Sequence, residues 1–236
     1  LLSGKALYHK TEKLIELAKE FAFYPLFDDY DRLKLLIREA KAKLQTRLFY
    51  FAESIATNRL FAPSSQLHHF LDLTSGLDYY SFLCDLDKKL EQDIEIIAHK
   101  LEQIRDTYFL QNNLLISITA EEVAIKDTIN GLNPFLDAIP DKVLPPVERY
   151  FHPKELNEGI IAPIQVQYCA KGGNFFRKGY SYSGKLRVLT NILNSDYLYR
   201  ELREKGGAYG AWSGFTLNGY MYFVSYRDPN LQRTLE

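Results

Sequence analysis

The sequence predicts an α+β fold, in which a helical region precedes a domain with a mainly antiparallel sheet. Apolar residues recur at spacings of three and four up to about residue 108, which is the period of an amphipathic helix. Beyond residue 158 the chain carries aromatic, strand-like runs and ten of its 13 glycines. This change of pattern places a boundary near residue 110. We therefore expect a helical connecting region over residues 1–110 and a partial α+β domain over residues 111–236.

Four amphipathic helices are expected in the first region. Their apolar stripes cover residues 7–21, 33–55, 67–71 and 86–108, and the third helix ends at Gly76. Four helices in succession without a strand between them predict a helical layer or a long helical hairpin.

Short and varied signals open the second region. The apolar run 114–118 predicts a strand. Thr119 and Glu122 then match a Thr-x-x-Glu capping box, which predicts a helix through about Ile129. Six of the nine prolines lie within residues 134–163, so we expect a long irregular connection there.

The chain beyond this connection alternates strand and helix signals. Apolar and polar residues alternate over residues 164–169, which predicts a strand, and Lys171-Gly172-Gly173 predicts a turn after it. Apolar residues over 186–193 predict a helix. Ser195 is suited to cap a second helix that runs to about Lys205.

A β-hairpin near the end of the chain is the strongest local signal. The aromatic-rich runs 209–217 and 220–226 have strand composition, and Asn218-Gly219 joins them. Because asparagine and glycine both accept positive φ angles, this pair predicts a type I′ turn.

Charge and hydropathy exclude two classes of partner. The chain has 29 Lys and Arg against 30 Asp and Glu, and its net charge is −1. A nucleic-acid-binding domain of this size would carry a basic surface. The sequence also has no apolar run close to the roughly 18–20 residues that cross a bilayer. We therefore expect neither a nucleic acid nor a membrane as a partner.

The histidines do not form a complete metal-binding motif. His9-Lys10-Thr11-Glu12-Lys13 begins like the inverted zinc motif His-x-x-Glu-His, but Lys13 occupies the second ligand position and its cation would repel Zn²⁺. His68 and His69 diverge by about 100° around a helix, so we expect one to face the core and the other water. The sequence predicts no metal and no other cofactor in this chain.

The segment from Leu202 to Gly210 carries the strongest chemical signal. It predicts the basic end of a helix, a glycine exit and the start of a strand, which accounts for Gly206 on structural grounds. Glycines on both sides of Tyr209 would leave that phenol open to another backbone. Arg203 and Tyr209 are both hydrogen-bond donors, suited to peptide carbonyls or to an oxyanion. A structural and a functional explanation of this segment both remain open.

Several short blocks of the sequence form one pattern: Asp196-Tyr197-Leu198, Leu202-Arg203, Lys205-Gly206-Gly207-Ala208-Tyr209-Gly210 and Ser225-Tyr226-Arg227-Asp228-Pro229-Asn230. This pattern resembles the C-terminal half of the presequence protease and falcilysin-like group of the pitrilysin (insulinase) zinc metallopeptidases. Phe27-Asp28-Asp29 and Asp31-Arg32-Leu33, followed by a long helix, resemble the helical region that connects the two halves in this group.

The resemblance implies a pitrilysin-like α+β domain in a clamshell protein whose halves close around an unfolded peptide. The N-terminal half of such proteins binds zinc through His-x-x-Glu-His, and the C-terminal half supplies an arginine and a tyrosine. By motif match these are Arg203 and Tyr209, which would hold the substrate and stabilise the tetrahedral intermediate. Gly206, Gly207 and Ala208 are implied to contact the substrate as well.

We expect the chain to be a segment of a larger protein. Met221 is its only methionine, and Asp228-Pro229 predicts a helix start only about two turns before Glu236. The resemblance implies a zinc metalloendopeptidase that degrades unfolded, targeting-peptide-like substrates in the cytoplasm, or in an organelle matrix if eukaryotic. Its zinc would lie in the N-terminal half, which is also an expected partner of this chain. Alone, the chain would bind no zinc and cleave nothing.

Two other functions are compatible with the same residues. The fold could serve as a non-peptidase scaffold or peptide-binding module, which the absence of His-x-x-Glu-His from the intact protein would indicate. A free-standing helical interaction protein would account for the first four helices, but it would leave Arg203 and Tyr209 without a role.

Overall fold

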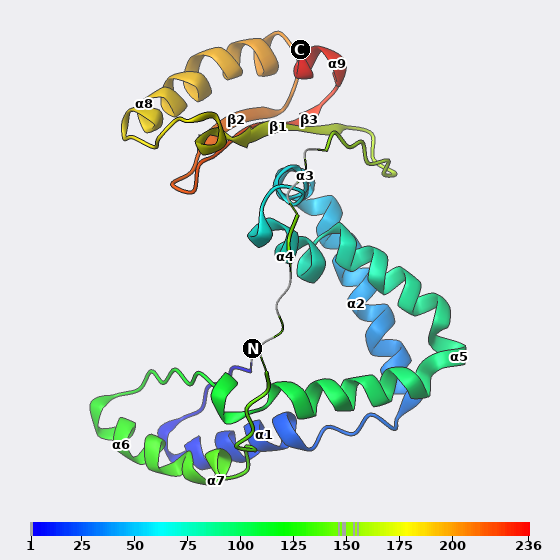
Figure 1. Cartoon of the computed structure of the whole chain (residues 1–236), viewed down its shortest axis with the longest axis vertical. Helices are drawn as coiled ribbons and strands as arrows, with labels where there is room; N and C mark the ends of the chain where they lie inside the picture. Colours follow the sequence, from blue (N-terminus) through cyan, green and yellow to red (C-terminus); the bar gives the residue numbers. More distant parts are fainter. Residues whose placement is uncertain (1, 146, 148–149, 153, 155) are drawn as a thin grey trace. The chain divides into compact units, whose positions relative to one another are not determined.

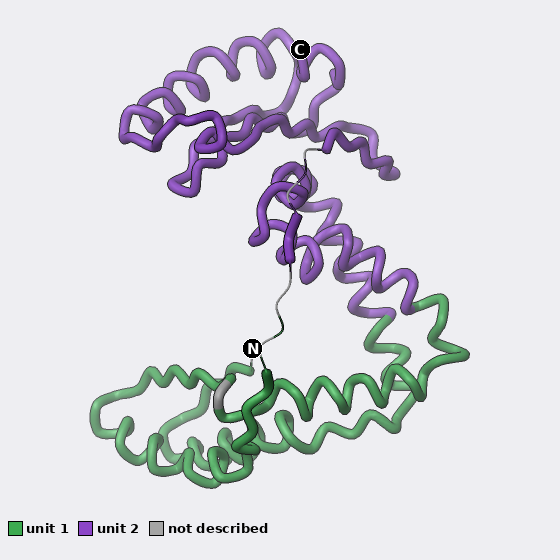
Figure 2. Tube along the Cα trace, viewed as in Figure 1, with its two compact units in different colours: residues 1–37, 87–149 green, residues 38–86, 150–236 purple. Residues whose placement is uncertain are grey.

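The computed structural model describes residues 2–145, 147, 150–152, 154 and 156–236 (Figure 1). The chain divides into two compact units, which are described separately below (Figure 2). The first comprises residues 1–37 and 87–149, and the second comprises residues 38–86 and 150–236. The helical first part and the antiparallel sheet near the end confirm the predicted α+β class. The boundary near residue 110 stays a prediction.

The first unit is a small helical core. It contains α1 (Thr11–Phe23), α6 (Glu122–Gly131) and α7 (Asn133–Leu136), together with the start of α2 (Tyr30–Tyr50) and most of α5 (Leu77–Tyr108). The buried side chains at its centre come from α1, from α7 and from the turn after α7: Ala22, Phe135 and Ile139. Helix α1 therefore forms from its apolar stripe, as the sequence predicts.

Two local predictions in this unit are wrong. Residues 114–118 belong neither to a helix nor to a strand, and the Leu115 side chain is 93% exposed. A strand needs a hydrogen-bonded neighbour, and the described part of the chain places none beside this run. Helix α6 forms where predicted, but its N-cap is Glu121, without a side-chain cap, so the capping box from Thr119 to Glu122 does not form.

The second unit contains the helices α3 (Ala52–Phe61) and α4 (Gln66–Ser75), with the end of α2 and the start of α5. The sequence predicts one helix over residues 33–55, whereas α2 and α3 are separated at Phe51, whose φ and ψ are −119° and 37°. Helix α4 begins at the N-cap Ser65, whose hydroxyl accepts a hydrogen bond from the His68 N–H, and it ends before Gly76 as predicted.

The sheet has three antiparallel strands, with β3 (Tyr220–Asp228) between β1 (Gln167–Asn174) and β2 (Gly210–Phe215). The predicted turn at residues 171–173 is wrong, because these residues lie inside β1. A Cβ atom at Gly172 would lie 2.1 Å from the Met221 carbonyl oxygen, so this glycine allows two backbones to approach closely.

The predicted hairpin between β2 and β3 is confirmed, but its turn is not type I′. Among the described residues other than glycine, Arg227 alone has a positive φ, so Asn218 does not supply the first of the two positive angles that a type I′ turn needs. Gly219 has φ of +83°, its N–H donates to the Thr216 carbonyl, and the Thr216 N–H donates to the Tyr220 carbonyl. These bonds describe a three-residue loop with a left-handed glycine, the next most common hairpin connection.

The two faces of the sheet are covered by different helices of the same unit (Figure 1). On one face, α8 (Lys185–Ile192) continues through the π-helical segments Leu193–Tyr197 and Tyr199–Glu204. Ser195 therefore caps no second helix, and its hydroxyl donates to the Asn191 carbonyl instead. On the other face, the Phe61 ring of α3 lies 4.7 Å from the Tyr220 ring.

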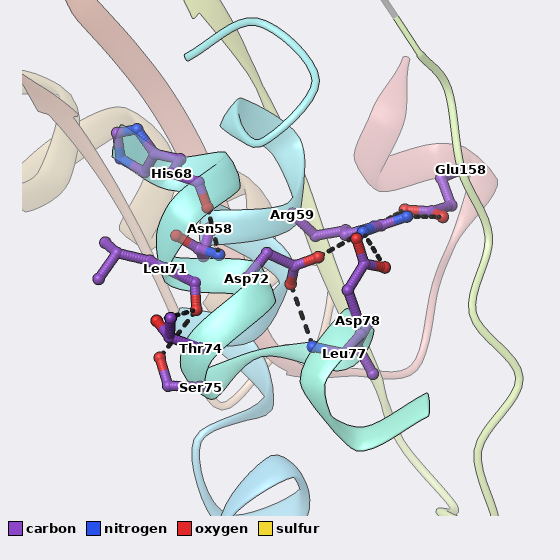
Figure 3. Close-up of polar contacts among 10 residues, drawn as sticks. All are labelled: Asn58, Arg59, His68, Leu71, Asp72, Thr74, Ser75, Leu77, Asp78 and Glu158. Atoms are coloured by element: carbon purple, nitrogen blue, oxygen red, sulfur yellow. Dashed lines mark hydrogen bonds and ion pairs between the residues drawn. The ribbon is translucent and has the colours of Figure 1, made fainter. Parts of the chain in front are cut away.

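One arginine connects the helices of the second unit. The Nη1 atom of Arg59 lies 2.5 Å from Asp72 and 2.9 Å from Asp78, and its Nε and Nη2 atoms donate to the two oxygens of Glu158 (Figure 3). Asp72 is 1% exposed and also accepts a hydrogen bond from the Leu77 N–H. Burial raises the pKa of the Asp72 carboxyl, and Asp78 adds to this effect while Arg59 opposes it. The buried carboxylate is therefore tolerated because the guanidinium compensates its charge.

Removing this guanidinium should destabilise the fold. We expect Arg59→Ala to lower the free energy of unfolding by about 3 kcal/mol, because Asp72 would remain buried without its cation. Arg200→Ala is the control, since the Arg200 side chain is 50% exposed in its pairs with Asp196 and Glu201 and should contribute at most about 1 kcal/mol. Urea unfolding of both variants tests this expectation, and equal losses would contradict it.

His68 should make stability depend on pH. Its ring lies 5.1 Å from Phe61 and 5.2 Å from Tyr220, and burial lowers the pKa of His68 below its ordinary value of 6.5. His69 is also partly buried, with its ring 5.5 Å from Phe151, so the expectation that one of the pair faces water is wrong.

The sign of the effect follows from this shift. The unfolded chain takes up a proton at His68 at a higher pH than the folded chain, so folding is favoured fully above the unfolded pKa and less as the pH falls below it. We expect His68→Gln to weaken the loss of stability on acidification, measured as the urea midpoint across this pH range. The exposed His99→Gln is the control and should leave the loss unchanged.

Candidate functional site

Arg203 lies in the last turn of the long helix that covers one face of the sheet. The helical segment Tyr199–Glu204 ends one residue later, and the Arg203 side chain is exposed. Its guanidinium carbon lies 5.2 Å from the centre of the Tyr199 ring. A cation at this position is favourable because the last carbonyls of a helix carry partial negative charge. The helix therefore presents an exposed guanidinium at its C-terminal end.

The two glycines after this helix have different structural reasons. A Cβ atom at Gly206 would lie 2.6 Å from the Leu202 carbonyl oxygen, so only glycine fits there without a shift of the backbone. Gly207 has φ of +79°, a conformation that glycine adopts without strain. Its N–H donates to the Arg203 carbonyl at 3.0 Å, and the N–H of the buried Ala208 donates to the Leu202 carbonyl at 2.9 Å. The chain therefore reverses in a closed, hydrogen-bonded turn.

Tyr209 follows this turn at the start of the hairpin. Its N–H donates to the Tyr226 carbonyl at 3.0 Å, which fixes its backbone to the central strand. Its side chain is 68% exposed, as the glycines around it predict. A Cβ atom at Gly210 would make only an ordinary contact, 3.4 Å from Trp212, so this glycine has no comparable steric reason. Arg203 and Tyr209 are thus two exposed donors on the two sides of one turn.

Three residues that sequence reasoning left without a role support this turn. Asn230 donates from its Nδ2 to the Gly206 carbonyl, and the buried Asp228 accepts hydrogen bonds from the Asn230 N–H at 2.8 Å and from the Thr234 hydroxyl at 2.7 Å. The guanidinium carbon of Arg227 lies 6.0 Å from the centre of the Tyr209 ring. All three belong to the Ser225–Asn230 block, and the spacing of Asp228 and Asn230 is the available signal for an Asx turn.

The prediction that Asp228 caps the last helix is wrong. Helix α9 (Gln232–Leu235) begins later and its N-cap is Leu231. Asp228 instead ends the central strand, where its carboxylate holds both the Asn230 backbone and the Thr234 side chain. The carboxylate therefore organises the turn between β3 and α9 rather than the helix start.

Two general features complete the description. No group of three or more His, Cys, Asp or Glu side chains among the described residues could hold a metal ion, and Lys13 lies in α1 where the inverted zinc motif would need a histidine. The described residues therefore do not fit a zinc ion. No helix in the described part of the chain is both long enough and apolar enough to span a bilayer.

The chain matches known proteins over its entire length. Residues 1–86 match a family described as peptidase-associated, which accompanies the subfamily C pitrilysin peptidases, and residues 157–236 match the family described as "PreP C-terminal domain". All of the chain aligns with 24% of "Protein HypA" of Clostridium perfringens at 38% identity over 235 residues. It also aligns fully with 22% of "Presequence protease 1, chloroplastic/mitochondrial" of Arabidopsis thaliana, at 29% identity over 238 residues.

A fungal relative extends this pattern. "Presequence protease, mitochondrial" of Yarrowia lipolytica is 28% identical over 254 residues, and the chain covers 24% of that relative's length. The chain thus spans about a quarter of the length of the curated relatives it matches. With both of its matched regions typical of one type of peptidase, the chain belongs to the presequence protease group of the pitrilysin zinc peptidase family, as part of its C-terminal region.

Proposed function

We propose that this chain is the non-catalytic, substrate-facing segment of a metalloendopeptidase that degrades unfolded, targeting-peptide-like substrates. The observation that supports the proposal is the presentation of two exposed donors, Arg203 and Tyr209, by a turn that main-chain hydrogen bonds close. The printed names of the relatives, several of which are presequence proteases, support the class of substrate. The segment would act together with the N-terminal half of its own chain.

The chemistry of the two side chains suits a peptide backbone. A guanidinium carries several N–H donors in a planar fork, so Arg203 would hold peptide carbonyls of an extended substrate. The Tyr209 phenol would donate to a carbonyl oxygen as negative charge develops on it, which stabilises the transition state more than the ground state. Of the three turn residues, Gly207 is exposed, Gly206 is half-buried and Ala208 is buried, so direct contact with a peptide suits Gly207 best.

The rest of the active site would lie outside this chain. Because the described residues do not fit a zinc ion, we place the metal in the N-terminal half and derive no step through it here. On this proposal the segment alone binds no zinc and cleaves no peptide. We propose the cytoplasm as its compartment, or an organelle matrix in a eukaryote, where two of the relatives are placed by name.

Removal of one hydroxyl tests the role of Tyr209. We expect Tyr209→Phe in the intact protein to lower kcat for an unfolded peptide by about 100- to 1000-fold, because the oxyanion would lose a donor. Stability should not change, since the side chain is largely exposed. Tyr180→Phe is the matched control, with 70% exposure, and should leave kcat unchanged. An unchanged kcat for Tyr209→Phe would refute this assignment.

Arg203 should affect binding as well as turnover. We expect Arg203→Ala to raise KM and to lower kcat by at least about tenfold in total, because the guanidinium would contact the peptide before and during the reaction. Arg187→Ala, an exposed arginine on α8, is the control and should change neither constant. If both variants behaved like the unmodified protein in peptide kinetics, the role of Arg203 would have to be abandoned.

A further inference from the structure

Arg227 has a backbone conformation that side chains other than glycine rarely adopt. Its φ is +49°, and among the described residues it is the one non-glycine with a positive φ. The Cβ atom makes this left-handed region unfavourable for most L-amino acids, and residues held there often serve a function. An arginine, unlike glycine or asparagine, has no local reason to accept this conformation.

A bulge in the central strand produces this conformation. In the pairing of β1 with β3, Gln167 lies opposite Asp228 and Cys169 lies opposite Ser225. Strand β3 therefore has one more residue than β1 in this interval, and Tyr226 and Arg227 together face Tyr168. Bulges of this kind redirect a side chain relative to the regular alternation of a strand.

The redirected side chain lies among three tyrosines. The guanidinium carbon of Arg227 is 5.5 Å from the centre of the Tyr226 ring and 6.0 Å from the centre of the Tyr209 ring. A hydrogen bond donated to the Tyr168 phenol raises the pKa of Arg227. The Tyr168 ring is itself 5.4 Å from the Tyr226 ring. The guanidinium thus has contacts to β1, to β3 and to the residue that precedes β2.

Stability alone does not account for this arrangement. The Arg227 side chain is exposed, its recorded neighbours are aromatic rings rather than carboxylates, and its backbone is strained. What the contact does supply is a second attachment for Tyr209. The Tyr209 ring is otherwise held by its backbone and by the Tyr226 ring at 5.9 Å, and most of its surface faces solvent.

We propose that Arg227 is a positioning residue, which holds the Tyr209 ring by a cation–π contact so that the phenol points towards the carbonyl oxygen of a bound peptide. The inference rests on the proposed function of Tyr209 and deepens it. Arg227 acts through the ring of Tyr209 and need not touch the peptide. The bulge and its strained residue are then part of the substrate-binding surface.

The intact protein carrying Arg227→Gly tests this inference. Glycine removes the guanidinium and relieves the backbone strain, so we expect an unchanged or higher melting temperature together with a kcat lowered about 10- to 100-fold. A purely structural role for Arg227 would lower the melting temperature as well. Arg227→Asn, which also tolerates a positive φ, should reproduce the loss of kcat, and Arg227→Lys, which retains the cation, should restore part of it.

A direct observation of the ring separates the inference from the proposed function. Fluorotyrosine can be incorporated into the intact protein, and the ¹⁹F signal of Tyr209 identified by its absence in Tyr209→Phe. We expect Arg227→Gly to shift this signal, whereas the matched Arg177→Gly should not. An unshifted signal would overturn the inference, whatever the kinetics show.

The kinetic coupling completes the test. If Arg227 acts through Tyr209, Arg227→Gly should cost little further kcat in a Tyr209→Phe background. Equal losses in both backgrounds would overturn the inference, because Arg227 would then act independently of the phenol. If Tyr209→Phe alone left kcat unchanged, the proposed function of Tyr209 would fail, and the inferred catalytic positioning would fail with it even if a shifted ¹⁹F signal showed that Arg227 contacts the ring.

Discussion

The pairing of Asp72 with Arg59 is the interaction on which the second unit depends most. A carboxylate that is 1% exposed is costly unless a cation and hydrogen-bond donors surround it. Arg59 meets this need from α3, the Leu77 N–H adds a donor from the start of α5, and Asp72 itself lies on α4. One charge therefore sets the relative position of three helix segments within the unit, and Glu158 ties the following connection to the same guanidinium.

The same unit shows how a sheet can carry a precise surface feature. Helix α3 covers one face of the sheet and the long helix that begins with α8 covers the other, so the central strand β3 is held from both sides. The end of β3 then organises the exit of the long helix, because Asn230 binds the Gly206 carbonyl and Asp228 holds Asn230. Two sequence blocks that are separate in the chain thus form one structural element, from which Arg203 and Tyr209 project.

The chemistry of this element is one-sided. Arg203 and Tyr209 are hydrogen-bond donors, and neither is placed beside a carboxylate or a histidine that could act as their base in the described structure. A surface of this kind can bind and polarise a peptide carbonyl, but the activation of a nucleophile needs other groups. This division of labour agrees with a chain that spans about a quarter of the length of its relatives.

The sequence by itself determined the elements whose causes are local. Helical spacing of apolar residues predicts α1, α4 and α5, and Asn218-Gly219 predicts the hairpin, because period and turn chemistry act over a few residues. It also singled out Arg203 and Tyr209 by their residue types and their glycine neighbours. Only the tertiary structure decided features that depend on distant partners. Residues 114–118 form no strand because no neighbouring strand is described there, and Gly172 lies within a strand because Met221 approaches it. The left-handed backbone of Arg227 has the same kind of cause, since pairing across the sheet creates the bulge that no local sequence signal encodes.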